Sequence, residues 1–115
     1  MRCERVGADD TCVRVALAGS LDTAGVGEVE LAFTAATVTP GRHVLVDLSG
    51  VDFVSSLGMG LLIRTTKACR ARGRSVVYFG APPRVMEAFE RSLVTPVLAF
   101  APDAAAARAM VEVPA

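Results

Sequence analysis

Aromatic residues are scarce in this chain, which has no tryptophan, one tyrosine and five phenylalanines among 115 residues. A core must therefore be built from valine, leucine and alanine, and a chain of this length has room for one domain without disulfides or metals. Net charge is also missing, because twelve acidic residues balance twelve basic ones. Nucleic acid is held by clustered Lys and Arg in excess, so the balance argues against direct nucleic-acid binding.

Cysteine is present without a pairing pattern. Cys3, Cys12 and Cys69 form no C-x-x-C motif, and their odd number leaves one unpaired under any bridging scheme. This predicts free thiols in a reducing compartment, which is the cytoplasm. The N-terminal M-R-C-E-R-V has no apolar stretch, and no run approaches roughly 18 apolar residues, so neither export nor membrane insertion is expected.

The usual signatures of catalysis and cofactor binding are absent. His43 is the only histidine, and no second histidine or Cys or Glu cluster accompanies it, so no metal site is expected. The chain has no G-x-x-x-x-G-K-[ST] loop, no G-x-G-x-x-G and no G-x-S-x-G elbow. A small enzyme or nucleotide-binding protein is therefore disfavoured, and we expect no catalytic residues and no cofactor.

The most informative stretch covers residues 44–62 and reads V-L-V-D-L-S-G-V-D-F-V-S-S-L-G-M-G-L-L. Its first apolar run predicts a strand covered on both faces, as in a largely parallel sheet. The Ser49-Gly50 pair predicts a turn, after which Phe53 and Val54 form a second short apolar piece. The stretch is thus a strand that feeds a helix through a polar junction, where open α/β sheets usually place their sites.

A helix follows the junction. Its apolar face is predicted from residues three and four apart, namely Leu57, Leu61, Leu62, Thr65 and Cys69. Ser55 or Ser56 is its natural N-cap. Glycine costs up to about 1 kcal/mol in a helix interior relative to alanine, so Gly58 and Gly60 need another explanation. Either they allow close packing, or they leave the hydroxyl of the capping serine open to a large partner.

Strands and helices alternate along the rest of the chain. Strands are expected at 2–6, 11–18, 75–79 and 97–100, and helices at 23–37, after Pro82-Pro83 and from Asp103 to about Val111. The helix after Pro82-Pro83 is expected to bury Val85, Phe89 and Leu93, and Gly73 is expected to cap the end of the preceding one. The chain is predicted to be a single α/β domain over 1–115, with a mixed sheet of about four or five strands and about four helices.

The stretch 44–62 resembles the signature of the STAS family, the anti-sigma factor antagonists. That signature has an aspartate-leucine-serine turn, a phenylalanine, and a D-S-S-G-L-G segment that opens a helix. Aligned on the phenylalanine, Ser56 falls on the family's phosphorylated serine, and Gly58 and Gly60 fall on its glycines. Ser55 stands where the family usually has aspartate, and Leu57 stands where it often has a second serine. The turn Gly-Ser-Leu-Asp at 19–22 also resembles a family landmark.

The resemblance implies a protein-binding module and the same order of strands and helices. The phosphoacceptor would be Ser56, with Ser55 as the second choice. The unmodified protein would bind an anti-sigma factor with serine kinase activity and so free a sigma factor, and a phosphatase would reverse the phosphorylation. The expected partner-binding residues are Asp22, Ser55, Ser56, Leu57, Gly58, Met59 and Ile63. Phosphate would add about −1.5 to −2 charges beside Asp22, Asp47 and Asp52 and repel an acidic partner.

Two points stay open at this stage. Met59 and Ile63 lie four residues apart on the predicted helix, and they either form an apolar patch beside Ser56 or pack under the last helix. The altered Ser55 and Leu57 also leave room for a constitutive STAS scaffold in a signalling or transport complex, in which Ser56 is not phosphorylated.

Overall fold

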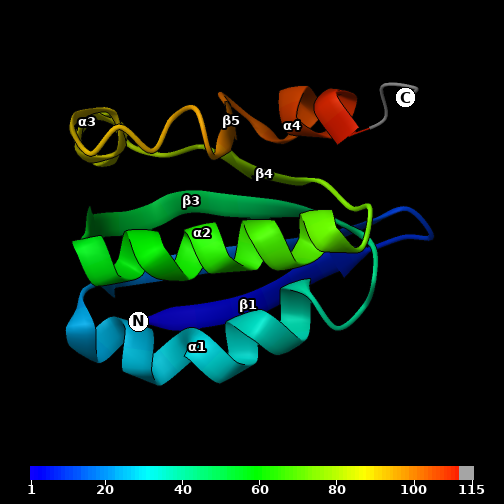
Figure 1. The fold of residues 1–115 in the computed structure, drawn as a ribbon, viewed down its shortest axis with the longest axis horizontal. Coiled ribbons are helices and arrows are strands. Elements are labelled where there is room, and N and C mark those ends of the chain that lie inside the picture. The colour runs from blue at the N-terminus through cyan, green and yellow to red at the C-terminus, as the bar shows by residue number, and fades with distance from the viewer. Residues whose placement is uncertain (112–115) are drawn as a thin grey trace.

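A computed structural model describes residues 1–111, which form a five-stranded sheet and four helices (Figure 1). The strands are β1 (Arg2–Ala8), β2 (Cys12–Leu21), β3 (His43–Val54), β4 (Val76–Phe79) and β5 (Ala99–Ala101). The helices are α1 (Thr23–Thr37), α2 (Ser56–Ala71), α3 (Pro83–Arg91) and α4 (Ala104–Val111). β1 is antiparallel to β2, and the other neighbouring strands are parallel. The predicted mixed α/β sheet is confirmed; the predicted domain ends at residue 115, and 112–115 lie outside the described residues.

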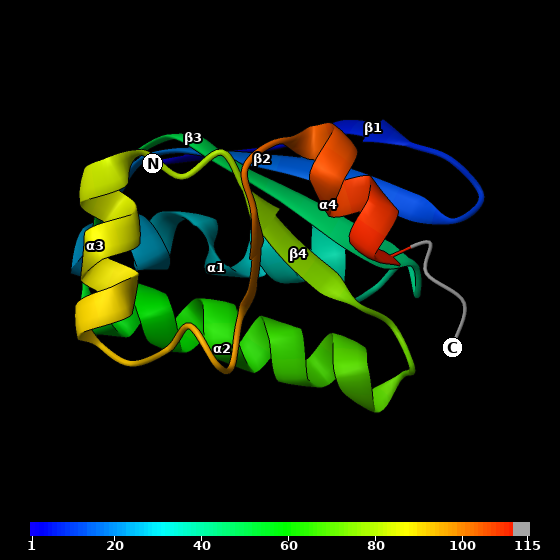
Figure 2. The same cartoon turned by 90° about the horizontal axis from the view of Figure 1, so that it is seen from above.

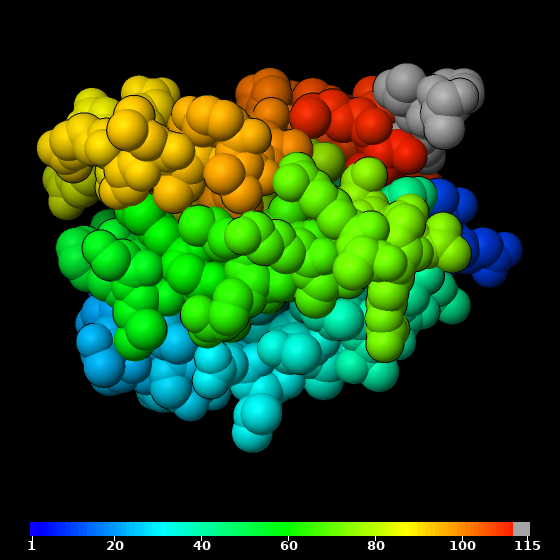
Figure 3. All heavy atoms as spheres, in the orientation of Figure 1, coloured from blue at the N-terminus to red at the C-terminus, as the bar shows by residue number. Residues whose placement is uncertain are grey.

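Two apolar layers lie on the two faces of the sheet. Figure 2 shows α1 and α2 on one side of the strands and α4 on the other. Successive strand residues point to opposite faces, so each inner strand contributes to both layers. The larger layer joins the sheet to α1, α2 and α3 and contains Val46 and Tyr78. The smaller layer, which contains Leu45 and Val77, joins it to α4. Figure 3 shows α2 as the middle band of one face, between α1 and the segment from α3 to β5.

The single tyrosine fixes the position of α2 on the sheet. The Tyr78 hydroxyl is buried and lies 2.9 Å from the Thr66 hydroxyl, and it donates a 3.0 Å hydrogen bond to the Leu62 carbonyl. Burial raises the pKa of Tyr78, so the hydroxyl stays neutral. Because both partners belong to α2, these bonds hold the helix to β4.

The turn predicted at Ser49-Gly50 is wrong, because β3 runs without a break from His43 to Val54. Two register shifts against β2 take its place. At the first, Leu48 and Ser49 lie opposite a single residue of β2, and at the second Asp52 is the extra residue. A bulge leaves a residue unpaired and bends its strand, so it tolerates the same polar and glycine residues as a turn.

The end of α3 also differs from the prediction. Leu93 is 80% exposed rather than buried, and its φ of 58° lies in the left-handed region. The chain therefore leaves α3 before Leu93 can face the core, and the last strand starts at Ala99 rather than at residue 97. Val85 and Phe89 are buried as predicted. Gly73 was expected as the cap of α2, but the C-cap is Arg72; Gly73 is the next residue and has a φ of +73°, which glycine adopts without strain.

Other features of the described chain bear on function. Cys3 and Cys69 are free thiols, and Cys12 and Cys69 are buried. An ion pair between Asp9 and Arg108 links the loop between β1 and β2 to α4.

No helix within residues 1–111 combines the length and the apolar character that crossing a membrane requires. In the same range, no three His, Cys, Asp or Glu side chains gather in a group suited to a metal ion.

Candidate functional site

The Leu21 carbonyl joins the starts of two helices. It accepts hydrogen bonds from the Ser55 backbone N–H at 3.0 Å and from the Ser55 hydroxyl at 2.9 Å. Asp22 follows directly, and its carboxylate accepts a 2.8 Å bond from the Gly25 N–H as the N-cap of α1. The N-termini of α1 and α2 consequently lie side by side at one end of the sheet (Figure 1).

Two glycines permit this close approach. A Cβ added to Gly58 would lie 2.5 Å from the Leu21 carbonyl oxygen, and one added to Gly25 would lie 2.1 Å from the Ser20 carbonyl oxygen. Gly60 is different, because its nearest neighbour would be the flexible end of Arg64 at 3.3 Å. Close packing therefore explains Gly58, whereas only one flexible side chain approaches Gly60.

The two serines at the junction have different roles. Ser55 is the N-cap of α2: it is half-buried, and its hydroxyl accepts a 3.1 Å bond from the Gly58 N–H while donating to Leu21. Ser56 is the first residue of the helix and is exposed, and its hydroxyl makes no hydrogen bond to any residue in the range 1–111. The first backbone N–H groups of a helix have no acceptor within it, so Ser56 lies at a positively polarised end.

Ser55→Ala is expected to lower the free energy of unfolding by about 1–2 kcal/mol, because both bonds of the capping hydroxyl are lost. Ser56→Ala is expected to change it by less than about 0.5 kcal/mol, since this side chain is exposed and unbonded. Urea denaturation of both variants measures the two values. Equal losses would contradict the assignment of Ser55 as the cap.

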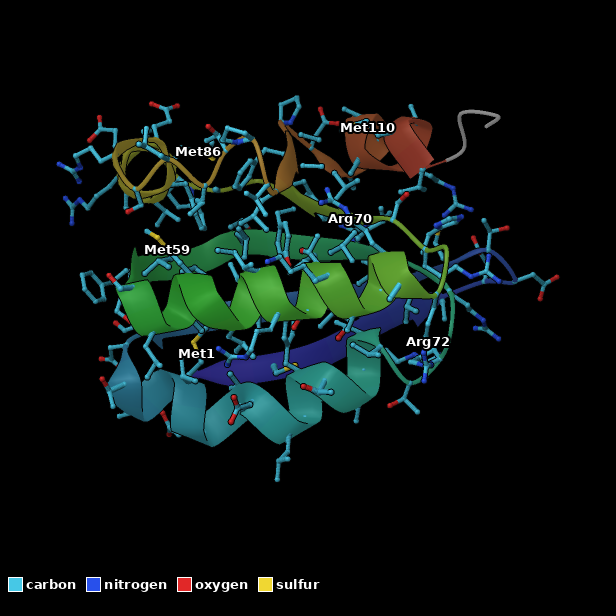
Figure 4. The ribbon with its side chains drawn as sticks, in the orientation of Figure 1. Met1, Met59, Arg70, Arg72, Met86 and Met110 are labelled. Atoms are coloured by element: carbon cyan, nitrogen blue, oxygen red, sulfur yellow. The ribbon has the colours of Figure 1, made fainter. Side chains whose placement is uncertain are left out.

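The apolar patch predicted from Met59 and Ile63 is wrong. Met59 is only 6% exposed and belongs to the larger core layer, and Ile63 is partly buried against that layer. Figure 4 shows Met59 pointing from α2 toward α3. The alternative, packing under the last helix, is also wrong, because α4 packs on the opposite face of the sheet and Met59 shares its core layer with α3.

Phe53 and Leu57 are the exposed apolar side chains at this junction. Phe53 is 52% exposed at the end of β3, and Leu57 is 45% exposed in the first turn of α2. Leu57 was expected in the buried stripe of α2, but its place one residue after Ser56 turns it outward. Phe53 was not expected at the site. Because its neighbour Val54 is buried, the alternation of a strand required Phe53 to face away from that core.

Two carboxylates lie at this end of the sheet. The Ser20 hydroxyl donates a 2.6 Å bond to the exposed Asp52, and Asp22 is half-buried one residue after Leu21. Asp47 was expected here as well, but the missing turn moves it away. It pairs with Ala16, which lies five strand residues before Leu21, a rise of about 17 Å.

Comparison with known proteins identifies the family. The family model described as "Mlab, STAS domain" matches residues 4–98, which is most of the chain. The chain belongs to the STAS domain family. It is also 30% identical over 81 residues to the anti-sigma-B factor antagonist of Staphylococcus aureus, covering 70% of this STAS chain and 75% of that protein. By homology the STAS chain is therefore a member of the anti-sigma factor antagonist family.

Solved structures show the same fold. A proposed anti-sigma factor antagonist from Thermotoga maritima aligns with a TM-score of 0.83 at 12% identity, over 93% of this chain and 92% of that one. The antagonist SpoIIAA in its unphosphorylated form aligns with a TM-score of 0.74 at 19% identity, over 99% and 100%. SpoIIAA from Bacillus in its phosphorylated form aligns with a TM-score of 0.62 at 19% identity, over 89% and 93%. At these low identities the structural likeness supports a shared fold only.

Proposed function

We propose that this STAS protein is an anti-sigma factor antagonist whose binding is switched off by phosphorylation of Ser56. In its unmodified form it binds an anti-sigma factor with serine kinase activity and frees a sigma factor. The partner phosphorylates Ser56 at the expense of ATP, and a phosphatase restores the binding form. The observation that carries the proposal is the exposed, unbonded Ser56 hydroxyl at the start of α2, next to a Ser55 hydroxyl that is already engaged as the cap.

The local electrostatics support a switch that leaves the fold intact. The unpaired N–H groups in the first turn of α2 are suited to hold a phosphate on Ser56. The modification brings about −1.5 to −2 charges to a surface that already carries Asp22 and Asp52. A partner surface complementary to the neutral hydroxyl then meets repulsion and a desolvation cost. Ser55 occupies the position at which STAS antagonists usually have an aspartate. It therefore caps α2 without adding a negative charge beside the acceptor.

The proposed contact surface surrounds Ser56. From the residues predicted for partner binding it retains Asp22, Ser55 and Leu57 and gains Phe53. Gly58 and Met59 are buried, and Ile63 packs against the core, so these three leave the surface. Exposed apolar side chains beside a polar group are typical anchors of protein interfaces. We therefore assign the main apolar contacts to Phe53 and Leu57.

The protein acts in this proposal by binding alone, in the cytoplasm, without catalysis of its own. STAS domains share the fold rather than one function, so the assignment rests on the site. The alternative is a constitutive scaffold subunit of a signalling or transport complex, in which Ser56 stays unmodified. The missing aspartate before Ser56 is the sequence feature that favours this alternative.

Peptide mapping after incubation with ATP and a kinase-type anti-sigma factor tests the proposal. We expect one phosphate on Ser56 in the natural protein and none in Ser56→Ala. Ser55→Asp is the matched control, because aspartate can accept the Gly58 N–H bond as an N-cap and removes the second hydroxyl. It should still be phosphorylated once. A partner that binds while no phosphate is incorporated would replace the switch with the constitutive scaffold.

A further inference from the structure

β1 leaves one edge of the sheet open. It is the first strand in the order β1-β2-β3-β4-β5 and pairs only with β2 among the described residues. Every residue of β1 except the partly buried Cys3 is exposed. At the opposite edge β5 has only three residues, so β1 is much the longer free edge. An open edge presents unpaired backbone N–H and C=O groups to any strand that fits it.

The usable part of the edge is short. A register shift between Arg5 and Gly7 bulges the strand, so Arg2, Cys3, Glu4 and Arg5 form its regular section. Bulges and charged side chains often protect an edge from pairing. Charges also select among registers, because opposite charges on facing residues attract and like charges repel. The order of charges along β1 therefore decides whether a second copy is repelled or accepted.

A two-fold axis allows few registers. In a symmetric antiparallel pair one residue faces its own copy, and the residues one step before and after it face each other. With Arg2, Glu4 or Arg5 at the centre, two identical charges face each other. With Cys3 at the centre, Arg2 of each copy faces Glu4 of the other, which gives two pairs of opposite charges. In that register Arg5 faces Met1, whose ammonium group is paired with Glu28 at 3.4 Å.

We propose that the edge of β1 is a docking surface for a second copy of this chain, which pairs antiparallel to it in the register centred on Cys3. Within one chain Arg2 and Glu4 form an ion pair at 4.0 Å, with side chains that are 82% and 64% exposed, and in the dimer each exchanges this partner for the opposite charge of the second copy. The two sheets become one continuous sheet. The dimer stands independently of the proposed switch at Ser56, because no residue of β1 belongs to the proposed contact surface.

The size of the contact sets the strength of association. Five facing residues on each copy bury far less than the roughly 1,200 Å² typical of stable complexes. We therefore expect a weak dimer, with a dissociation constant on the order of 0.1 mM. At that strength the protein is a monomer when dilute and a dimer at millimolar concentration.

Charge reversal tests the register. Sedimentation equilibrium of the full chain up to about 1 mM should show the dimer. Arg2→Glu places glutamates opposite each other and Glu4→Arg places arginines opposite each other, so each should weaken association about tenfold or more. The double variant R2E/E4R exchanges the charges and should restore it. A natural protein that stays monomeric at this concentration, single variants that associate normally, or a double variant that does not recover would each overturn the proposal.

Cross-linking through Cys3 provides a second measurement. Facing residues of antiparallel strands have Cα atoms about 4.5–5.5 Å apart, within the range of a disulfide. Diamide should therefore join two copies: two thiols lose their protons and an electron pair, which reduce diamide to its hydrazine, and one S–S bond forms. Burial raises the pKa of Cys3, so the reaction is run at about pH 9. Cys3→Ser should give no covalent dimer, and a dimeric natural protein that does not cross-link would overturn this register.

Discussion

Replacing Gly58 with alanine is expected to lower the free energy of unfolding by about 3 kcal/mol, the upper end of the range for overpacking a rigid site. The added methyl group would sit 2.5 Å from the Leu21 carbonyl oxygen and 2.7 Å from its Cγ. It cannot be accommodated by a rotamer change, because the closest atom belongs to the backbone. The start of α2 must move, and the bonds between Ser55 and Leu21 weaken with it. Urea denaturation measures the loss.

Gly60→Ala is the matched control, two residues along the same helix. Only the end of the Arg64 side chain approaches its position, so alanine is expected to stabilise the protein by up to about 1 kcal/mol through helix propensity. A Gly58→Ala variant as stable as Gly60→Ala would show that close contact with Leu21 does not position α2.

Changing Phe53 and Leu57 together to serine is expected to weaken binding to the anti-sigma factor by about 100-fold or more while leaving stability nearly unchanged. Truncation of a central apolar anchor costs about 2 kcal/mol or more at an interface, and two such losses exceed 100-fold in affinity. Both side chains are about half exposed, so little core packing is lost. Isothermal titration calorimetry gives the affinity, and thermal melting gives the stability.

Leu31→Ser controls for the general loss of surface apolar area. Leu31 is 87% exposed on α1 and lies outside the proposed contact surface. It should leave affinity and melting temperature unchanged. If the serine variants of Phe53 and Leu57 bind as tightly as this control, the partner contacts another surface of the domain.

Periodicity and capping residues were sufficient to predict most of the fold. Gly73 was predicted within one residue of the C-cap of α2, because capping depends on local backbone conformation, which nearby residues determine. The strand of residues 44–46 was recognisable from its β-branched composition. Ser49-Gly50 misled the prediction because a bulge and a turn use the same residue types, and only pairing with β2 distinguishes them.

The side chains around the site were harder to predict. Met59 and Leu57 are both apolar and lie two positions apart in α2, yet one is buried and the other is exposed. Which face of α2 is covered depends on its packing against α1, β3 and β4, and on α3 beside Met59, and this tertiary packing has no local signal. The predicted burial of Leu93 was wrong for a similar reason, because Leu93 itself adopts a left-handed conformation after α3 and redirects the chain. The assignment of Ser56 as phosphoacceptor stays a prediction from the family alignment, and the exposure of its hydroxyl supports it.

The central claim is that a phosphate on Ser56 abolishes partner binding without unfolding the domain. Its most direct test is calorimetric titration of the unmodified and the Ser56-phosphorylated protein with the same anti-sigma factor, together with a melting curve of each form. The account predicts at least roughly 100-fold weaker binding after phosphorylation, with a melting temperature that is equal or higher because the helix N-terminus holds the phosphate. Equal affinity of the two forms, or loss of binding through unfolding, would contradict it.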